Sequence, residues 1–162
     1  MDQADNNGVT ALHYVADKGH LPVVKYLVAE GKANVHLADG DGSTALHVAA
    51  DNGRLPVIKY LVTEGKAHVN HADNDGVTAL WWAARQGHAP VVKFLATEGK
   101  ATDDDVKAAL RLTASCAAEE KDLVVSTALT EVVKVLVESK ATVDTHIWSL
   151  VLQIKVDNKL PV

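Results

Sequence analysis

One stretch of the sequence has acidic residues that alternate as they do in a calcium-binding loop. In ADGDGST, Asp39, Asp41 and Ser43 supply oxygen atoms at every second position, and calcium prefers such oxygen ligands. The stretch departs from the calcium pattern at two decisive positions. Thr44 stands where the loop needs a glycine, and Ala50 stands where a bidentate glutamate closes the site. We therefore expect a plain polar turn here.

The histidines invite comparison with metal and catalytic sites. His68 and His71 lie three residues apart in HVNH, but Asp73 is the only carboxylate close by and neither a cysteine nor a third histidine joins them. His13 and His47 each end a Thr-Ala-Leu-His motif without the nucleophile or orienting acid that catalysis requires. We expect no metal, no cofactor and no enzymatic activity.

The most informative feature of the chain is internal repetition. Thr10, Thr44 and Thr78 are spaced 34 residues apart. Each opens the same pattern, which continues through an apolar stretch, a glycine and Val-Val-Lys-Tyr-Leu or a close variant, and ends in Glu-Gly-Lys-Ala. A fixed period of about 20 to 50 residues is the signature of a repeat architecture. The 162 residues therefore form one elongated domain in which each unit packs on its neighbours.

Each unit is predicted to contain two short helices. Thr10 can cap the first helix with its side-chain oxygen, and Gly19 ends that helix in a left-handed conformation. Pro22 suits the first turn of the second helix, which continues to Gly31. Three leucines at equivalent positions of the first helices should be buried, namely Leu12, Leu46 and Leu80.

The stretch DNNGVTALHYVADKGHLPVVKYLVAEGKANV resembles the ankyrin repeat, in which Asp-x-x-Gly forms a β-turn finger and Thr-Pro-Leu-His starts the first helix. The resemblance implies an all-α ankyrin-repeat solenoid of helix-turn-helix units with β-turn fingers. It also implies that His13 and His47 hydrogen-bond neighbouring backbone. The sequence departs from the family pattern by an alanine in place of the proline, and by one added lysine in Gly-Lys-Ala.

The pattern continues beyond residue 100 in altered form. We expect one domain, residues 1–162, with repeats at about 5–38, 39–72 and 73–102, an irregular repeat at 103–143 and a truncated fifth at 144–162. The finger before the fourth repeat is shortened, Thr102 and Asp105 form a capping box, and CAAEEKDLVVS is an insertion. Both ends of the array look open, which predicts a section of a longer chain or complex.

Composition limits the class of partner. The net charge of −5 argues against nucleic acid, which is bound by clustered lysine and arginine. The single Cys116 has no internal disulfide partner, and no apolar run approaches about 18 residues. We expect an intracellular, cytoplasmic chain with no membrane insertion and a protein as its partner.

The resemblance implies a protein-protein interaction module that presents a concave finger and helix surface to its partner. The alternative is a structural segment of a larger ankyrin-containing multidomain protein or assembly, with contacts mainly at its open ends. The finger tips carry acids and few bases, so the partner should have a basic or polar contact patch. The candidate binding positions are those that vary between repeats within a fixed frame, together with Trp81: Asn6, Asn7, Val9, Asp17, Lys18, Gly40, Asp41, Ser43, Asp51, Asn52, Asn74, Asp75, Val77, Trp81, Arg85 and Gln86.

Two tryptophans distinguish the third repeat. Trp81 stands where His13 and His47 stand, and Trp82 stands where Tyr14 and Val48 stand. We expect Trp82 in the core between repeats, because its position is apolar in the other units. Two interpretations of Trp81 remain open. It covers the gap left by the shortened finger while its indole N–H reaches a carbonyl, or it projects into the groove as a binding anchor.

Overall fold

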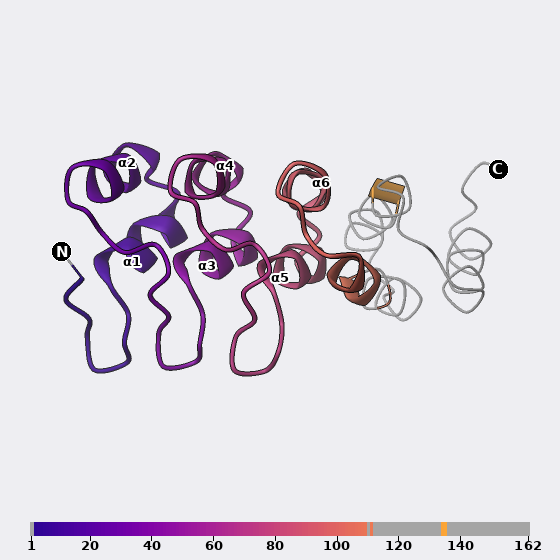
Figure 1. Cartoon of the computed structure of the whole chain (residues 1–162), viewed down its shortest axis with the longest axis horizontal. Helices are drawn as coiled ribbons and strands as arrows, with labels where there is room; N and C mark the ends of the chain where they lie inside the picture. Colours follow the sequence, from indigo (N-terminus) through magenta and orange to yellow (C-terminus); the bar gives the residue numbers. More distant parts are fainter. Residues whose placement is uncertain (1, 110, 112–133, 136–162) are drawn as a thin grey trace.

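The structure, a computed structural model, describes residues 2–109, 111 and 134–135. The named helices are α1 (Ala11–Lys18), α2 (Leu21–Ala29), α3 (Ala45–Asp51), α4 (Leu55–Thr63), α5 (Ala79–Arg85) and α6 (Ala89–Thr97). Residues 103–109 are also helical. The helices α1, α3 and α5 form an inner row, and α2, α4 and α6 form an outer row beside it (Figure 1).

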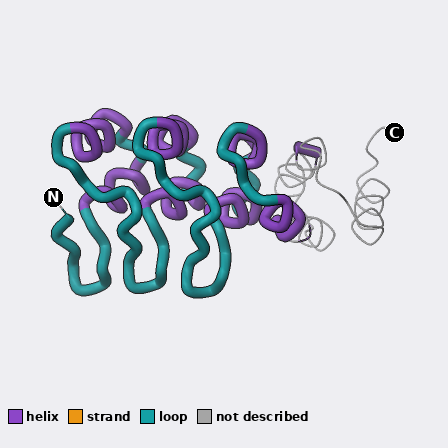
Figure 2. Tube along the Cα trace, in the orientation of Figure 1, coloured by secondary structure: helices purple, strands orange, loops and turns teal. Residues whose placement is uncertain are grey.

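Three finger loops project from the same side of the inner row (Figure 2). Each finger is closed at its base by one antiparallel bridge, between Ala4 and Thr10, Ala38 and Thr44, or Ala72 and Thr78. Among the described residues these isolated bridges are the only β pairing, and no β-strand is present. The expected all-α stack of helix-turn-helix units with turn fingers is confirmed.

The threonine and histidine of the repeated motif lock the start of α1 and α3, whereas Trp81 replaces the histidine in α5. The backbone N–H of Thr10 donates to Nδ1 of His13 at 3.2 Å, and the Thr10 hydroxyl lies 2.8 Å from the same nitrogen. Because Nδ1 accepts, the ring hydrogen sits on Nε2, which donates to the carbonyl of Ser43 in the next finger at 3.1 Å. Thr44 and His47 repeat this arrangement. The backbone contacts expected of both histidines are confirmed.

The lysine added to each repeat takes an uncommon backbone conformation. Lys32, Lys66 and Lys100 have φ angles of 55°, 57° and 59°, in the left-handed region that glycine favours. The glycine before the lysine serves another purpose. A Cβ at Gly65 would lie 2.8 Å from the carbonyl oxygen of Leu61. The glycine therefore permits close approach to the end of α4, and the lysine makes the turn.

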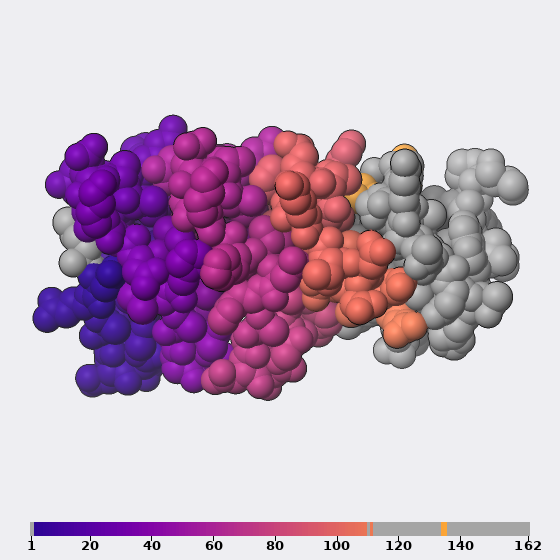
Figure 3. Space-filling view, viewed as in Figure 1, coloured from indigo at the N-terminus to yellow at the C-terminus, as the bar shows by residue number. Residues whose placement is uncertain are grey.

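A continuous apolar core joins the units. Leu12, Leu46 and Leu80 are 3%, 1% and 0% exposed, so their expected burial is confirmed. Burying each side chain stabilises the fold by about 1.5 to 3 kcal/mol. The core continues to Val106 and Ala109 in the helical segment after α6. Figure 3 shows the units as successive bands along the molecule, each touching its neighbours.

The start of the fourth repeat meets half of the capping-box prediction, because the backbone N–H of Thr102 donates to Oδ1 of Asn70 and not to the Asp105 side chain. The backbone N–H of Asp105 donates to Oγ1 of Thr102 at 3.2 Å, and the Thr102 hydroxyl donates to the Asp105 carboxylate. Helix follows at once, and residues 98–102 contain no bridge of the kind that closes the other fingers. The predicted insertion and the truncated fifth repeat lie outside the described residues.

Candidate protein-binding groove

A groove of about 470 Å³ lies between the second and third fingers and the inner row of helices. The fingers contribute one wall, and the last turns of α1 and α3 contribute the other, with α5 at one end. The side chains that line it are mostly polar: Asp17, Asp41, Ser43, His47, Val48, Asp51, Asn52, Asp73, Asn74, Asp75 and Trp82.

The lining of the groove carries acidic side chains and no lysine or arginine. Five of its lining residues are aspartates. Two basic residues lie close to the lining: Lys18 pairs with the carboxylate of Asp17 at 2.7 Å, and the guanidinium carbon of Arg85 lies 5.5 Å from the ring centroid of Trp82. A cleft lined by one sign of charge concentrates its field and attracts ions of the opposite sign. The lining therefore favours a positively charged ligand.

Asp73 holds the third finger in place. Its Oδ1 accepts hydrogen bonds from the backbone N–H groups of Asp75 and Val77, both at 3.0 Å. Its Oδ2 accepts from the indole Nε1 of Trp82 at 3.0 Å, which joins the finger to α5. The Asp73 residue is only 9% exposed. These bonds fix the position of the third finger, which forms part of one wall of the groove.

The first repeat contains the same device in a more exposed form. Asp5 accepts from the backbone N–H groups of Asn7 at 2.9 Å and Val9 at 3.0 Å, and from the hydroxyl of Tyr14 at 3.1 Å. The hydrogen bonds from Val9 and Asn7 hold the pKa of the Asp5 carboxyl below its usual value. A hydrogen-bond donor four residues after the motif threonine thus bonds the finger aspartate in the first and third repeats.

The expectation that Trp82 lies in the core between repeats is wrong. Its side chain is half-buried, lines the groove and bonds the finger carboxylate of Asp73. The apolar Val48 at the equivalent position suggested a core residue, whereas Tyr14, which carries a polar donor, was the signal for a finger contact. The structure therefore adds an aromatic surface to the groove.

Trp81 is also half-buried and contacts its neighbours edge to face. Its ring centroid lies 5.2 Å from that of Trp82, and the guanidinium carbon of Arg85 lies 5.5 Å from both centroids. Among the described residues no carbonyl accepts from the Trp81 indole, so that detail of the covering interpretation is not met. Its role in binding stays a prediction.

The structure brings seven of the sixteen candidate positions together in the groove: Asp17, Asp41, Ser43, Asp51, Asn52, Asn74 and Asp75. The remaining candidates lie outside its lining, on the first finger, at other finger positions and near the ends of the inner helices: Asn6, Asn7, Val9, Lys18, Gly40, Val77, Trp81, Arg85 and Gln86. Gln86 reaches the rim, where its amide donates to Asp51 at 2.6 Å. Four lining residues were missed because they belong to the repeated frame or were assigned to the core: His47, Val48, Asp73 and Trp82.

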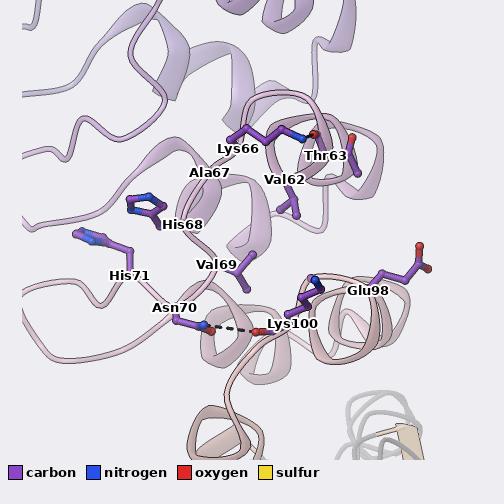
Figure 4. A pocket seen from close by; sticks show the side chains of 11 residues that line it. Val62, Thr63, Lys66, Ala67, His68, Val69, Asn70, His71, Glu98 and Lys100 are labelled. Carbon is purple, nitrogen blue, oxygen red and sulfur yellow. Dashed lines mark hydrogen bonds between the residues drawn. The ribbon is translucent and has the colours of Figure 1, made fainter.

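A second hollow, of about 900 Å³, lies at the ends of α4 and α6 and along the loop that follows α4 (Figure 4). Val62 and Val69 form part of its lining, and Lys66 and Lys100 stand on different sides of it. The side-chain amide of Asn70 donates to the carbonyl of Lys100 across it at 3.4 Å. No candidate binding position falls in this hollow.

The histidines of HVNH pack against other histidines. The His68 ring lies 4.1 Å from that of His36, and the His71 ring lies 5.8 Å from that of His47 in an edge-on arrangement. Among the described residues no group of three or more potential ligands is placed to hold a metal ion. Burial and the neighbouring His68 lower the pKa of His36.

Comparison with known families agrees with this architecture. A family model described as ankyrin repeats (3 copies) matches residues 1–73, and a single ankyrin-repeat model matches residues 75–107. A search of the curated proteins finds no match. The fold, the fingers and the threonine-histidine locks define a helical repeat protein. The chain belongs to the ankyrin repeat family.

Membership of the family fixes the general class of function. Ankyrin repeats are generally protein-protein interaction modules, and proteins built from them are typically non-enzymatic. In the part of the chain that the structure describes, no helix has the length and apolar character to cross a membrane.

Proposed function

We propose that this chain is a protein-interaction module whose concave finger and helix surface binds a positively charged segment of a protein partner. The observation that carries the proposal is the groove, in which five aspartates and Trp82 converge without a lining cation. A lysine or arginine of the partner would enter beside Trp82, where a cation gains from the ring face as well as from the carboxylates.

The groove is arranged for binding with little reorganisation. Asp73 is held by its finger and by Trp82, and Asn74 bonds the neighbouring finger through its amide and backbone N–H groups. Side chains that are already fixed lose less conformational freedom on association. Asp41 and Asp75 lie exposed on the fingers and are available for contact.

The proposal is tested with a fluorescent deca-arginine peptide, whose binding is followed by anisotropy at increasing salt. Binding should weaken as salt rises, because exposed charges are screened. The double variant Asp41→Asn, Asp75→Asn should weaken it by about tenfold, or about 1.4 kcal/mol. Glu64→Gln, beyond the end of α4 in the outer row, is the matched control and should have little effect. Equal losses in both variants would contradict the assignment.

The natural partner can be sought with a photo-crosslinking residue placed at Asn52, which lines the groove, or at Thr63, which is exposed at the end of α4. Proteins captured from Asn52 but not from Thr63 should carry basic segments. If Thr63 captured the same proteins, or convex-side substitutions weakened binding while Asp41, Asp75 and Arg85 tolerated change, the groove would not be the binding site.

The wider setting of the module is also a proposal. The net charge of −5 supports a protein and not nucleic acid as the ligand, and the lone Cys116 agrees with an intracellular, cytoplasmic setting. A second role, as a structural segment of a larger ankyrin-containing multidomain protein or assembly, is proposed on the repeat architecture alone. Such a role would act together with binding in the groove.

A further inference from the structure

The second hollow, at the ends of α4 and α6, differs from the groove in the charge of its lining. Lys66 and Lys100 line it, whereas Glu98 is the one lining residue that carries a carboxylate. Figure 4 shows the Glu98 side chain directed away from the interior of the hollow. The second hollow and the groove have no lining residue in common. The second hollow is therefore a separate surface that presents basic groups.

The two lysines can meet an anionic ligand. Within the part of the chain that the structure describes, neither lysine forms an ion pair, and Nζ of Lys100 has no hydrogen-bond partner. Lys66 donates from Nζ to the carbonyl of Thr63 at 2.5 Å, which uses one of its three ammonium hydrogens. The Lys100 side chain points into the hollow from the side opposite Lys66 (Figure 4). A ligand that enters between the two lysines therefore meets positive charge on both sides.

The backbone of both lysines favours a use for their side chains. Their φ angles of 57° and 59° lie in the left-handed region, which glycine and asparagine adopt at a lower steric cost. Residues held in such sparsely populated conformations cluster at functional sites. The turn also fixes the direction in which each side chain leaves the backbone, because Lys66 and Lys100 occupy the same turn of successive repeats. The two exposed side chains therefore start from fixed points.

An apolar floor lies between the two lysines. Val62 is half-buried and Val69 is 8% exposed, and both line the hollow. Figure 4 shows the two valines between Lys66 and Lys100. Covering this floor with an aliphatic side chain removes apolar surface from water. The lining thus combines cations for carboxylates with a surface for an aliphatic side chain.

Small side chains lie on the loops beside this floor. In the loops of the first and second repeats, the rings of His36 and His68 stack with centroids 4.1 Å apart. One period of 34 residues later, the same positions hold Asn70 and Thr102. The backbone N–H of Thr102 donates to Oδ1 of Asn70 at 3.2 Å. An amide and a hydroxyl thus replace two rings, so aromatic side chains do not fill this space.

We propose that the second hollow binds an acidic segment of a protein partner, in which carboxylates flank an aliphatic side chain. The carboxylates pair with Lys66 and Lys100, in hydrogen bonds that charge strengthens. The aliphatic side chain covers Val62 and Val69. Because the lysines stand on opposite sides of the apolar floor, they suit two separate carboxylates better than one phosphate group. This binding is additional to that of a basic segment in the groove.

The test uses a fluorescent decapeptide with two leucines at its centre and glutamates on both sides, and follows its binding by anisotropy. Lys100→Asn should weaken this binding by about tenfold. The variant removes one ammonium group, and asparagine keeps the left-handed turn. Lys32→Asn is the matched control, because Lys32 has a φ of 55° in the same turn of the first repeat and lies outside the lining. It should leave the binding and, like Lys100→Asn, the melting temperature nearly unchanged.

Two further comparisons separate this site from the groove. Deca-glutamate should bind less tightly than the leucine-containing peptide by about fivefold or more, because it does not cover the apolar floor. The double variant Asp41→Asn, Asp75→Asn should leave binding of both acidic peptides nearly unchanged, whereas Lys100→Asn should leave binding of deca-arginine nearly unchanged. Failure of one site is therefore distinguishable from failure of the other.

Three results would overturn the proposal. Equal losses in Lys100→Asn and Lys32→Asn would show an attraction that any lysine of the chain supplies. Absence of binding, or equal affinity for the two acidic peptides, would remove the evidence for the hollow and its apolar floor. Displacement of the peptide by inorganic phosphate, at an ionic strength matched with chloride, would assign the hollow to a phosphorylated ligand and not to carboxylates.

Discussion

The indole nitrogen of Trp82 donates to the carboxylate of Asp73 at 3.0 Å, and this bond connects α5 to the finger of its own repeat. Because the carboxylate also accepts from two backbone N–H groups of the finger, it joins the finger wall of the groove to the helix at its end. Arg85 lies 5.5 Å from the Trp82 ring centroid on the same helix. The two carboxylate oxygens of Asp73 therefore stabilise the finger and also position Trp82 beside the groove that we propose binds the partner.

Removal of the Asp73 carboxylate tests this connection. Asp73→Ala leaves two backbone N–H groups and the indole of Trp82 without their acceptor, and it should lower the free energy of unfolding by about 2 kcal/mol. Asp5→Ala is the matched control, because it removes the same bonds in an exposed finger, where water replaces them. Urea denaturation should show the smaller loss for Asp5→Ala; the opposite order would contradict the role given to Asp73.

Replacement of lysine by glycine should have opposite effects on stability at Lys66, which has a left-handed backbone conformation, and at Lys59, which is helical. Lys66→Gly should raise the free energy of unfolding by about 1 kcal/mol, because glycine adopts a φ of 57° without the steric cost that a side chain carries. Lys59→Gly, within α4, should lower it by about 1 kcal/mol. Urea denaturation of the two variants is the measurement. A loss of stability at Lys66 would show that its side chain contributes more than its backbone conformation costs.

Histidine burial predicts a loss of stability in mild acid. Burial lowers the pKa of His47 despite the nearby Asp73, and burial together with His68 lowers the pKa of His36. The unfolded chain, with histidine pKa near 6.5, therefore binds more protons, and the free energy of unfolding should fall as pH drops below that value. The contribution of Asp5 is present above its usual pKa of 3.8 and is lost only as pH falls below that value.

Urea denaturation at steps from pH 7.5 to pH 5 checks this dependence. His36→Gln should reduce the decline, because it removes one of the two groups. A free energy of unfolding that stays level or rises as the pH is lowered would contradict the lowered pKa values of these histidines. An unchanged decline in His36→Gln would assign the whole effect to the buried His47.

The fold was predictable because its signals are local and repeated. Thr10, Gly19 and Pro22 each mark a helix end within a few residues. Three copies of the same pattern at a spacing of 34 residues indicate a repeat architecture. Which side of an inner helix faces its finger is decided by contacts between residues further apart in the sequence. Trp82 bonds Asp73, which lies nine residues earlier on the finger. Because the equivalent Val48 has no polar side-chain group, the second repeat gives no sign that this position faces the finger.

The groove was predictable only in part for a related reason. Variation between repeats identified Asp41, Asp51 and Asp75, because binding positions can change without disturbing the frame. It could not identify His47 or Asp73, which serve the frame and also line the groove. The Asp73 position is aspartate in all three repeats, and the His47 position changes only once, to Trp81 in the third repeat.

The two tryptophans can be separated by substitutions that borrow from the second repeat. Trp81→His restores the residue found at His47, and we expect it to lower stability through the lost contacts with Trp82 and Arg85 while binding of deca-arginine stays intact. Trp82→Val restores the residue found at Val48 and removes the aromatic surface of the groove, so it should weaken the same binding by about tenfold. If Trp81→His left stability unchanged and weakened binding by about 2 kcal/mol or more, Trp81 would be the anchor, since tryptophans are prominent among interface hot spots.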